Sequence, residues 1–347
     1  MKEASDNKMF IYPLISSLYI NDIFSKLKNY KARILVYHGV TKQAPGVFNW
    51  QQITEGQFIE QMKYLRKHYN VVPLAVILEH VILKKRFPKG CVALTFDDGY
   101  ENNFSLVYPL LKEFNLPATF FISTAFVGNG TKSLWFDTIY NGIAKYRGSE
   151  IDLSPCGFGI ADTSTPSAKS QATDWLCNEL KTLSYTEMQD RLQCILNKVE
   201  MNGQNCIPFP GLSWEQIRIL AKDPLFTIGG HSHTHPILTK LPEEQAWKEI
   251  IINKELLEEN IGKRVTIFSY PNGNWDASLV SLLKRAGYEF ALTSEENFVT
   301  SNPYAVERIT ARNPSSIYLF EGLVSGLIPV TKRCLSFLKE QPASISE

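Results

Sequence analysis

The sequence predicts an α/β fold built from parallel strands, and two observations support this prediction. From Ile34 onward, short apolar runs typical of buried strands alternate with amphipathic segments typical of helices. Polar residues able to do chemistry follow directly after several of these runs, as expected where parallel strands end at a common rim. A chain of 347 residues is long enough to form an α/β barrel as one unit.

The expected elements follow one another in this alternating order. A helix over about Glu55–His68 places Phe58, Met62 and Leu65 on one face, and a second covers about Glu101–Phe114. A capping box at Ser213 to Gln216, and Pro242, Asp276 and Gly287, delimit later helices. The expected strands are Ile34–Tyr37, Cys91–Thr95, Ala118–Ile122, Phe226–Ile228, Val265–Phe268, Glu289–Leu292 and Val306–Thr310.

Residues 130–210 interrupt the alternation. They contain loop residues and two amphipathic helices, Trp175–Leu183 and Met188–Val199, which predict a helical insertion between the third and fourth strands. We therefore expect an N-terminal helical segment (1–32), a barrel domain (33–312) that carries this insertion, and a C-terminal helical segment (313–347).

Composition excludes several classes of protein. The net charge of +1 gives no field suited to nucleic acid, whereas a neutral glycan fits this balance. The six cysteines form no Cys-x-x-Cys pair, so we expect reduced thiols and no disulfide framework. The apolar run Met9–Ile20 is too short to cross a membrane and resembles no signal peptide, which predicts a cytoplasmic protein. That segment either packs on the barrel or rests on a membrane surface as an interfacial helix.

Two polar clusters at strand ends carry the expected chemistry. Asp97 and Asp98 follow the run that begins at Cys91, and His231 and His235 follow Phe226–Gly230 with a spacing that suits chelation of a divalent metal. Taken alone, each cluster is a solvated turn. Together, one carboxylate and two imidazoles form a three-ligand site with open positions, which is typical of catalytic zinc, and the other carboxylate is free for proton transfer.

Three blocks of the sequence resemble the polysaccharide deacetylases, also called NodB-like carbohydrate esterases. Thr95–Gly99 is similar to their first motif, His231–Pro236 to the second and Phe268–Gly273 to the third. The order matches, and the likeness spans roughly residues 33–312. The opening strand Ile34–Val40 further resembles the poly-N-acetylglucosamine deacetylase branch.

The resemblance implies a fold and a set of roles. The fold is a distorted or incomplete (β/α) barrel of about seven strands. Asp97 would be the general base, while Asp98, His231 and His235 would hold one divalent metal ion, for which zinc is expected. The backbone N–H of Tyr100 would stabilise the oxyanion, and Tyr270 and Pro271 would shape the substrate groove. His233, between the two ligands, is expected to stay off the metal.

The sequence departs from the family pattern at two positions. Ser269 stands where many members carry an arginine that orients the base, and Phe290–Ser294 lacks the histidine that acts as general acid. Arg308 is our candidate for the cation, with Arg312 as the alternative; a surface arginine paired with Glu307 or solvent is the plain interpretation. His38, which directly follows the first strand, is the candidate acid, although it can also simply brace the loop that carries Asp97.

These features predict a hydrolase that removes N-acetyl groups from N-acetylglucosamine-type units of a polysaccharide or oligosaccharide. Trp135, at the start of the insertion, is expected to stack on sugar rings or only to anchor the insertion. Two alternative functions stay open: a deacylase or deformylase of a small or lipid-linked amino sugar, and a catalytically silent glycan-binding module. Retention of Asp97 argues against the silent module, because metal binding alone does not need a second carboxylate.

Overall fold

The computed structural model of this chain describes residues 30–128, 133–199, 209–311 and 316–327. The apolar run Met9–Ile20 and the alternative cation Arg312, both named in the sequence analysis, lie outside the described residues.

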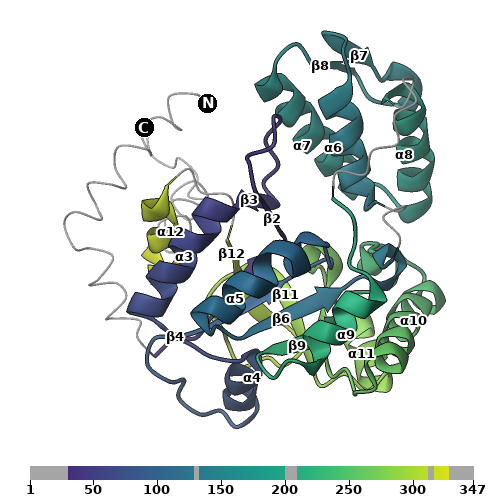
Figure 1. Cartoon of the computed structure of the whole chain (residues 1–347). Coiled ribbons are helices and arrows are strands. Elements are labelled where there is room, and N and C mark those ends of the chain that lie inside the picture. Colours follow the sequence, from purple (N-terminus) through teal and green to yellow (C-terminus); the bar gives the residue numbers. More distant parts are fainter. Residues whose placement is uncertain (1–29, 129–132, 200–208, 312–315, 328–347) are drawn as a thin grey trace, which may run out of the picture.

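Seven parallel strands form a closed barrel, which confirms the predicted fold class (Figure 1). Closure depends on the first strand, since Val36 pairs with Thr95 on one side and with Thr310 on the other. A two-residue strand, β4 (Asn70–Val71), adds to the start of β5. In spatial order the barrel strands are β1 (Arg33–Tyr37), β5 (Cys91–Phe96), β6 (Ala118–Ile122), β9 (Phe226–Gly230), β10 (Ile267–Ser269), β11 (Phe290–Glu296) and β12 (Val306–Thr310). A separate short parallel pair joins β2 (Gly39–Thr41) and β3 (Gln52–Thr54).

Helices connect and cover these strands. The predicted helix over Glu55–His68 is observed as α3, and both it and α9 begin with a capping box, at Thr54 and at the predicted Ser213. The helix expected over Glu101–Phe114 differs: it starts as a π-helical turn, and Pro109, which has no N–H to donate, lies at the start of the α-helix that follows. The remaining helices around the barrel are α4 (Leu74–Ile82), α5 (Tyr108–Phe114), α9 (Trp214–Lys222), α10 (Glu243–Ile261), α11 (Ala277–Arg285) and α12 (Ile317–Ser325).

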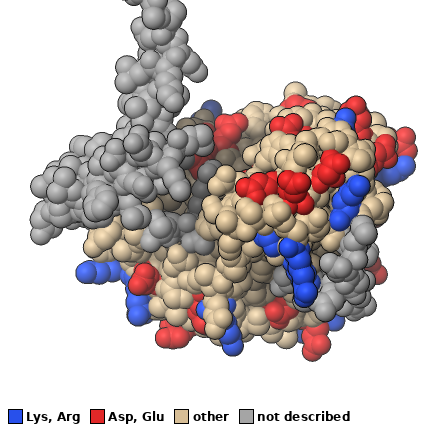
Figure 2. All heavy atoms as spheres, turned by 90° about the horizontal axis from the view of Figure 1, so that it is seen from above, with Lys and Arg blue, Asp and Glu red and all other residues tan. Residues whose placement is uncertain are grey.

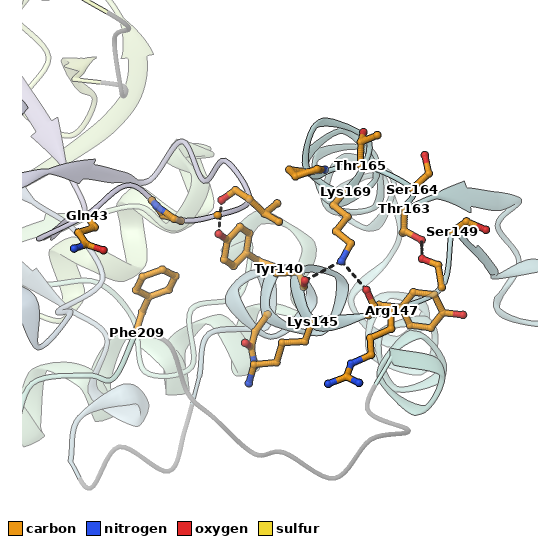
Figure 3. Close-up of a pocket in the computed structure, with 18 of the residues that line it drawn as sticks. Gln43, Tyr140, Lys145, Arg147, Ser149, Thr163, Ser164, Thr165, Lys169 and Phe209 are labelled. Atoms are coloured by element: carbon orange, nitrogen blue, oxygen red, sulfur yellow. Dashed lines mark hydrogen bonds between the residues drawn. The ribbon is translucent and has the colours of Figure 1, made fainter.

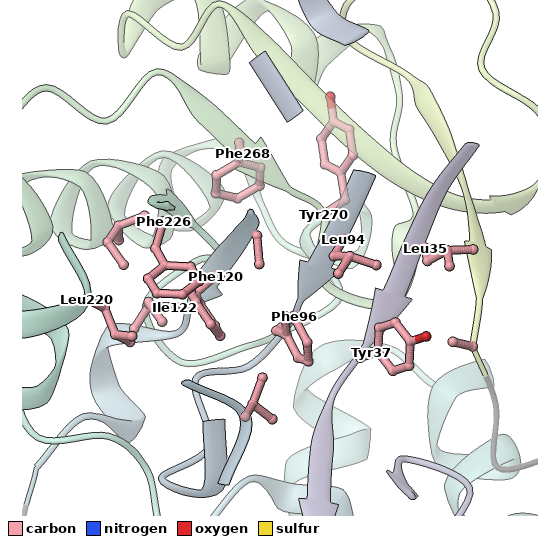
Figure 4. Packing of buried hydrophobic residues seen from close by; sticks show 14 of the residues in the cluster. Leu35, Tyr37, Leu94, Phe96, Phe120, Ile122, Leu220, Phe226, Phe268 and Tyr270 are labelled. Carbon is pink, nitrogen blue, oxygen red and sulfur yellow. The ribbon is translucent and has the colours of Figure 1, made fainter. Parts of the chain in front are cut away.

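The packing of β5 shows on which side of the strand Asp97 lies. Leu94 and Phe96 join the large cluster shared with the outer helices, where Phe96 stacks between Tyr37 and Phe120 with ring centroids 5.3 and 5.1 Å away (Figure 4). Ala93 belongs to a different cluster, as the period of two in a strand requires. Continuing this alternation past the end of β5 places Asp97 on the side of Ala93.

The insertion lies between β6 and β9, the third and fourth barrel strands, as predicted. It forms a lobe with its own apolar core at one end of the barrel (Figure 1). An antiparallel pair within it was not expected from the sequence. The elements of the lobe are α6 (Trp135–Lys145), β7 (Glu150–Asp152), β8 (Ile160–Asp162), α7 (Pro166–Thr182) and α8 (Tyr185–Val199).

The prediction that all cysteines are reduced thiols is wrong for one pair. Cys156 and Cys194 form a disulfide that ties a loop of the insertion to α8. Their separation of 38 residues conforms to no short motif, so only the folded lobe brings them together. Cys91 and Cys177 remain free thiols.

The chain outside the barrel bears on two predictions, the C-terminal helical segment and the lack of a membrane-spanning helix. In the C-terminal segment, Phe320 and Val324 of α12 are buried in the main core, and Phe320 packs edge-on against Tyr64 of α3. Among the described helices, none is both long and apolar enough to span a bilayer. On the face shown in Figure 2, acidic and basic side chains are interspersed with uncharged residues, which agrees with the absence of a large single-sign field.

Candidate active site

The turn after β5 presents two carboxylates in a strained conformation. Asp98 has a φ of +74°, a left-handed backbone that is uncommon for residues other than glycine, although aspartate, asparagine and histidine adopt it more often than most, and Gly99 follows at +86°. A Cβ on Gly99 would lie 3.2 Å from the side chain of Ile122, so the position has little room for another residue. His235 is also left-handed, at +62°. Strain of this kind is typical of functional sites.

Asp98, His231 and His235 meet in one buried cluster. Oδ1 of Asp98 lies 3.3 Å from Nε2 of His231 and 3.2 Å from Nε2 of His235, and the three potential ligand atoms are all within 4.8 Å of one another. Two donor atoms on a tetrahedral zinc are about 3.3 Å apart, given bonds of about 2.0–2.1 Å. Both oxygens of Asp98 are buried without a hydrogen-bond partner among the described residues. The residues present therefore fit a divalent metal ion.

Hydrogen bonds hold the histidine motif His231–Pro236 so that the rings of His231 and His235 face this cluster. Nδ1 of His231 is 2.7 Å from the carbonyl oxygen of Ser269, which fixes the proton on Nδ1 and leaves Nε2 directed at Asp98. Glu249 accepts hydrogen bonds from the backbone N–H groups of His233 and Thr234. The ring of His233 turns away and bonds Thr124 at 2.9 Å, so it lies outside the cluster.

Asp97 forms a bidentate ion pair with Arg308, which lies on the last strand of the barrel. Nη1 and Nη2 of Arg308 donate to its two oxygens at 2.8 and 2.7 Å. The hydroxyl of Ser269 donates to Asp97 at 3.2 Å and accepts from Arg308 at 2.9 Å. The Arg308 side chain is fully buried and does not pair with Glu307, which instead binds Thr300. Ser269 thus leaves room for Arg308 to reach the carboxylate.

Charges at the site favour ionised carboxylates. Burial raises the pKa of Asp97, but the charges of Arg308 and His231 and the hydrogen bonds from Arg308 outweigh it and hold the pKa below its usual value. Burial likewise opposes ionisation of Asp98, whose pKa is nevertheless held well below the ordinary range by its contacts with His231 and His235. Asp97 is therefore ionised at neutral pH, which suits a proton acceptor.

His38 lies beside the two carboxylates at the end of β1. Its half-buried ring packs edge-on against Trp50, with centroids 5.3 Å apart, and its carbonyl accepts a hydrogen bond from Asn103 at 2.7 Å. Burial lowers the pKa of His38, while the negative charges of Asp98 and Asp97 partly oppose that shift. The ring is therefore close enough to the cluster to feel its charges.

Next to Trp135, at the start of the insertion, Phe136 contacts His235 and Asp137 contacts Tyr100. From the sequence, the aromatic rings of this segment were candidates for sugar stacking, and Asp137 had no expected role. Phe136 packs edge-on against the ring of His235, with centroids 5.4 Å apart. Asp137 is fully buried and accepts a hydrogen bond from the hydroxyl of Tyr100 at 2.7 Å. The signal that could have revealed Asp137 is an acidic residue three positions from each of the apolar Leu134 and Tyr140, on an otherwise buried helix face.

A groove of about 500 Å³ begins at His235 and runs between α6 and α8. Trp135 lines it, together with Tyr185, Gln189 and the apolar Met188 of α8. The mixture of aromatic and polar side chains is typical of sites that bind small organic ligands.

The predicted substrate contact of Tyr270 is wrong. Its side chain is fully buried in the main core, and its hydroxyl donates to the carbonyl of Tyr304 at 3.1 Å. Pro271 is buried as well, and neither residue lines the groove at His235. The strand β10 ends at Ser269, one residue later than expected, and Tyr270 and Pro271 enter the turn that follows with their side chains buried.

A larger cavity of about 840 Å³ lies between the insertion and the segment Thr41–Val47, and none of the predicted site residues lines it. Its polar groups are largely engaged in holding the scaffold (Figure 3). Lys169 donates to the carbonyls of Ala144 and Tyr146 at the end of α6, and Tyr140 donates to the carbonyl of Val47. The buried cluster of Asp98, His231 and His235 therefore adjoins the smaller groove, through His235, and not this cavity.

Comparison with known proteins agrees with this geometry. The family model "Polysaccharide deacetylase" matches residues 84–153 and 165–291. The chain is 21% identical over 283 residues to the putative polysaccharide deacetylase YxkH of Bacillus subtilis, covering 80% of this chain and 71% of that protein. It is 37% identical over 78 residues to the poly-β-1,6-N-acetyl-D-glucosamine N-deacetylase of Staphylococcus aureus, but this stretch covers only 22% of this chain and 26% of that enzyme.

Solved structures share the fold at low sequence identity. The Streptococcus pyogenes deacetylase PplD, in complex with acetate, superposes with a TM-score of 0.56 at 16% identity, covering 84% of this chain and 98% of that one. IcaB from Ammonifex degensii gives a TM-score of 0.55 at 17% identity, covering 85% and 97%. With the family model spanning more than half of the sequence and the barrel matching, this chain belongs to the polysaccharide deacetylase family of hydrolases.

Proposed function

We propose that this protein is a metal-dependent hydrolase that removes N-acetyl groups from N-acetylglucosamine-type units of a polysaccharide or oligosaccharide. The observation that carries the proposal is the buried cluster of Asp98, His231 and His235 beside the Asp97–Arg308 pair at the rim of the barrel. The staphylococcal relative, which is named for this reaction on poly-β-1,6-N-acetyl-D-glucosamine, supports the choice of sugar.

Asp98, His231 and His235 would hold the metal, for which zinc fits the donor set of one carboxylate and two imidazoles. When bound, the ion polarises the acetyl carbonyl and acidifies the attacking water. Because Nδ1 of His231 is committed to the Ser269 carbonyl, its Nε2 is oriented towards the ion before the ion binds.

Asp97 would accept the proton of the attacking water. Its ionised state at neutral pH and its position next to the metal ligands support this role. Arg308 and Ser269 fix the carboxylate from behind, so they would orient the base as the family's arginine does in other members. The backbone N–H of Tyr100, which bonds no acceptor among the described residues, would donate to the developing oxyanion.

His38 would donate the proton that the departing amine needs. The amine is a poor leaving group, and a positioned acid makes its departure possible. The products are acetate and a free amino sugar.

Trp135 would offer a stacking surface to a neighbouring sugar, because it lines the groove that begins at His235. A neutral glycan suits the near-zero net charge, and nothing in the composition favours nucleic acid. Contact of residues 1–32 with a membrane surface remains a prediction.

Besides the roles of Tyr270 and Pro271, we revise the predicted compartment. The sequence predicts a cytoplasmic protein, whereas the Cys156–Cys194 disulfide favours an oxidising compartment. We infer that the insertion folds where disulfides persist.

A panel of acylated amino sugars tests the function. Metal-loaded protein is incubated with N-acetylglucosamine oligomers, the monosaccharide, N-formyl analogues and a lipid-linked amino sugar, and the products are identified by mass spectrometry. Loss of acetyl groups from the oligomers is expected. Preferential release of formyl, or turnover of the lipid-linked sugar alone, would establish the alternative deacylase, and binding without turnover would establish a silent glycan-binding module.

A further inference from the structure

Asp137 is a buried carboxyl group that the proposed reaction does not use. It lies in the first turn of α6, its side chain is fully buried, and no cation among the described residues contributes to its environment. One of its oxygens, Oδ1, has no hydrogen-bond partner in the described part of the chain. Burial of a carboxyl group without a cation is unfavourable, so its retention at this place points to a role.

Within the described residues, the side chain of Asp137 forms one hydrogen bond, and it leads to Tyr100, close to the metal ligand Asp98. The hydroxyl of Tyr100 donates to Oδ2 at 2.7 Å, and Tyr100 follows the metal ligand Asp98 by two residues. The phenol ring is enclosed by Phe126 and Phe209, with centroids 5.6 and 6.2 Å away. Because the ring is enclosed on these sides, the hydroxyl is confined to this region.

The Tyr100 hydroxyl lies near two carboxyl groups, those of Asp98 and Asp137, and can donate to either. Asp98 is close enough that both its charge and a hydrogen-bonding contact with the hydroxyl add to the burial that raises the pKa of Tyr100, so the hydroxyl lies within reach of either carboxyl group. Of the two, Asp137 receives the short bond, at 2.7 Å, whereas neither oxygen of Asp98 has a hydrogen bond of good geometry from a described residue. A tyrosine has one hydroxyl proton, so a bond to Asp137 is a bond withheld from Asp98.

That choice matters for metal binding. A donor on the oxygen that faces His231 and His235 would compete with the ion for the same lone pair, and a donor on the other oxygen would reduce the basicity of the ligand. Resting on the metal centre proposed above, we propose that Asp137 is a positioning residue that draws the hydroxyl proton of Tyr100 away from Asp98, so that both oxygens of Asp98 stay available to a metal ion. In this way α6 of the insertion contributes to the metal centre of the barrel without touching metal or substrate.

The role does not depend on the protonation state of Asp137. Burial, with Asp98 adding to it, raises the pKa of Asp137 well above its usual value. Both the ionised and the neutral carboxyl group present an oxygen that accepts from Tyr100. An asparagine amide presents one too, whereas leucine has a similar shape and no acceptor. Comparing Asn with Leu at position 137 therefore tests the effect of accepting the hydrogen bond, because the two side chains have similar shapes and only Asn has an acceptor.

The test is a competition titration of zinc against a chelating dye, with folding checked by circular dichroism and thermal melting. Asp137→Leu should weaken zinc binding about tenfold or more, because Tyr100 then turns to Asp98, while Asp137→Asn should stay within about threefold of wild type. In the Tyr100→Phe background, Asp137→Leu should have no further effect on affinity, since no hydroxyl remains. Asp174→Leu, the same change in α7 of the insertion, is the matched control and should leave zinc affinity unchanged.

Each outcome decides the matter. Wild-type affinity in a folded Asp137→Leu protein, or an equal loss in the Tyr100→Phe background, would refute the inference. If Asp137→Leu does not fold, Tyr100→Phe alone decides: a loss of about tenfold would mean that the hydroxyl supports Asp98, contrary to the inference, and retained affinity supports it. Zinc binding without turnover on any acyl sugar would refute the proposed function and leave this inference standing. A wild-type protein that binds no divalent metal would refute both.

Discussion

Arg308, from the last strand of the barrel, binds both oxygens of Asp97 at 2.8 and 2.7 Å. The two residues are 211 positions apart in sequence, and closure of the barrel through β1 brings their strands near each other. Bidentate pairs of this kind are the stronger and more directional form of ion pair. Because of this pair, the protonation state of Asp97 depends on a residue outside the three family motifs.

Replacing Arg308 by Met should move the acid limb of the pH profile of kcat/KM to higher pH. Asp97 then loses the cation that holds its pKa below the usual value, and burial, which acts in the opposite direction, raises the pKa. A larger share of the base is protonated at mildly acidic pH, so activity there falls first. We also expect a loss of stability of about 3–5 kcal/mol from the unpaired buried charge. Arg264→Met, at an exposed arginine 4.0 Å from Glu289, is the control and should change neither. An unshifted acid limb in a folded Arg308→Met protein would contradict the proposed orienting role.

Metal content should follow the cluster of Asp98, His231 and His235. Purified protein is expected to bind roughly one divalent ion, and alanine at any of the three positions should remove it. His233→Ala should retain the metal, because that ring bonds Thr124 and faces away from the cluster. Elemental analysis of each variant after dialysis gives the answer, and full occupancy in His235→Ala would show that the ligand set is wrong.

Asp97→Asn should separate metal binding from turnover. The amide keeps the shape of the side chain but cannot take a proton, so the metal should stay while kcat falls by about 10²-fold or more. The measurement is steady-state kinetics on the best substrate of the panel together with metal analysis of the same sample. Loss of metal with this change would mean that the roles of Asp97 and Asp98 are exchanged.

The site could be predicted from sequence where the chemistry follows directly from strand ends. Asp97, Asp98, His231 and His235 are each placed by a short apolar run that stops, and the parallel barrel then brings the runs to one rim. Residues whose function depends on packing were harder to assign. Asp137 reaches Tyr100 only because the insertion docks on the barrel, and Tyr270 turns into the core because β10 is short. The local sequence marks Asp137 only as an acidic residue on an apolar helix face, and it names the partner of neither residue.

The disulfide was missed for a similar reason, and it supports a prediction of its own. Closing a loop of 38 residues restricts the unfolded chain by about 4 kcal/mol in the chain-entropy estimate. Reduction, or Cys156→Ser with Cys194→Ser, should therefore lower the melting temperature of the insertion. Protease protection of residues within α7 and α8 should fall in parallel. Cys177→Ser is the control, since that thiol is free. Equal melting curves before and after reduction would show that the crosslink does not stabilise the lobe.

His38→Gln tests the last unassigned step, the donation of a proton to the departing amine. Burial lowers the pKa of His38, and Arg308 and His231 lower it further, although Asp98 and Asp97 oppose the shift. An acid with a lowered pKa loses its proton at lower pH, so the alkaline limb of kcat/KM should begin below the usual titration of histidine. Glutamine retains polarity but cannot titrate. We expect turnover to fall by about 10²-fold, with metal retained and the alkaline limb displaced or absent. His80→Gln, on α4 away from the rim, is the control and should preserve both limbs. If His38→Gln keeps near-native rates with both limbs intact, His38 only braces the loop of Asp97, and another group donates the proton.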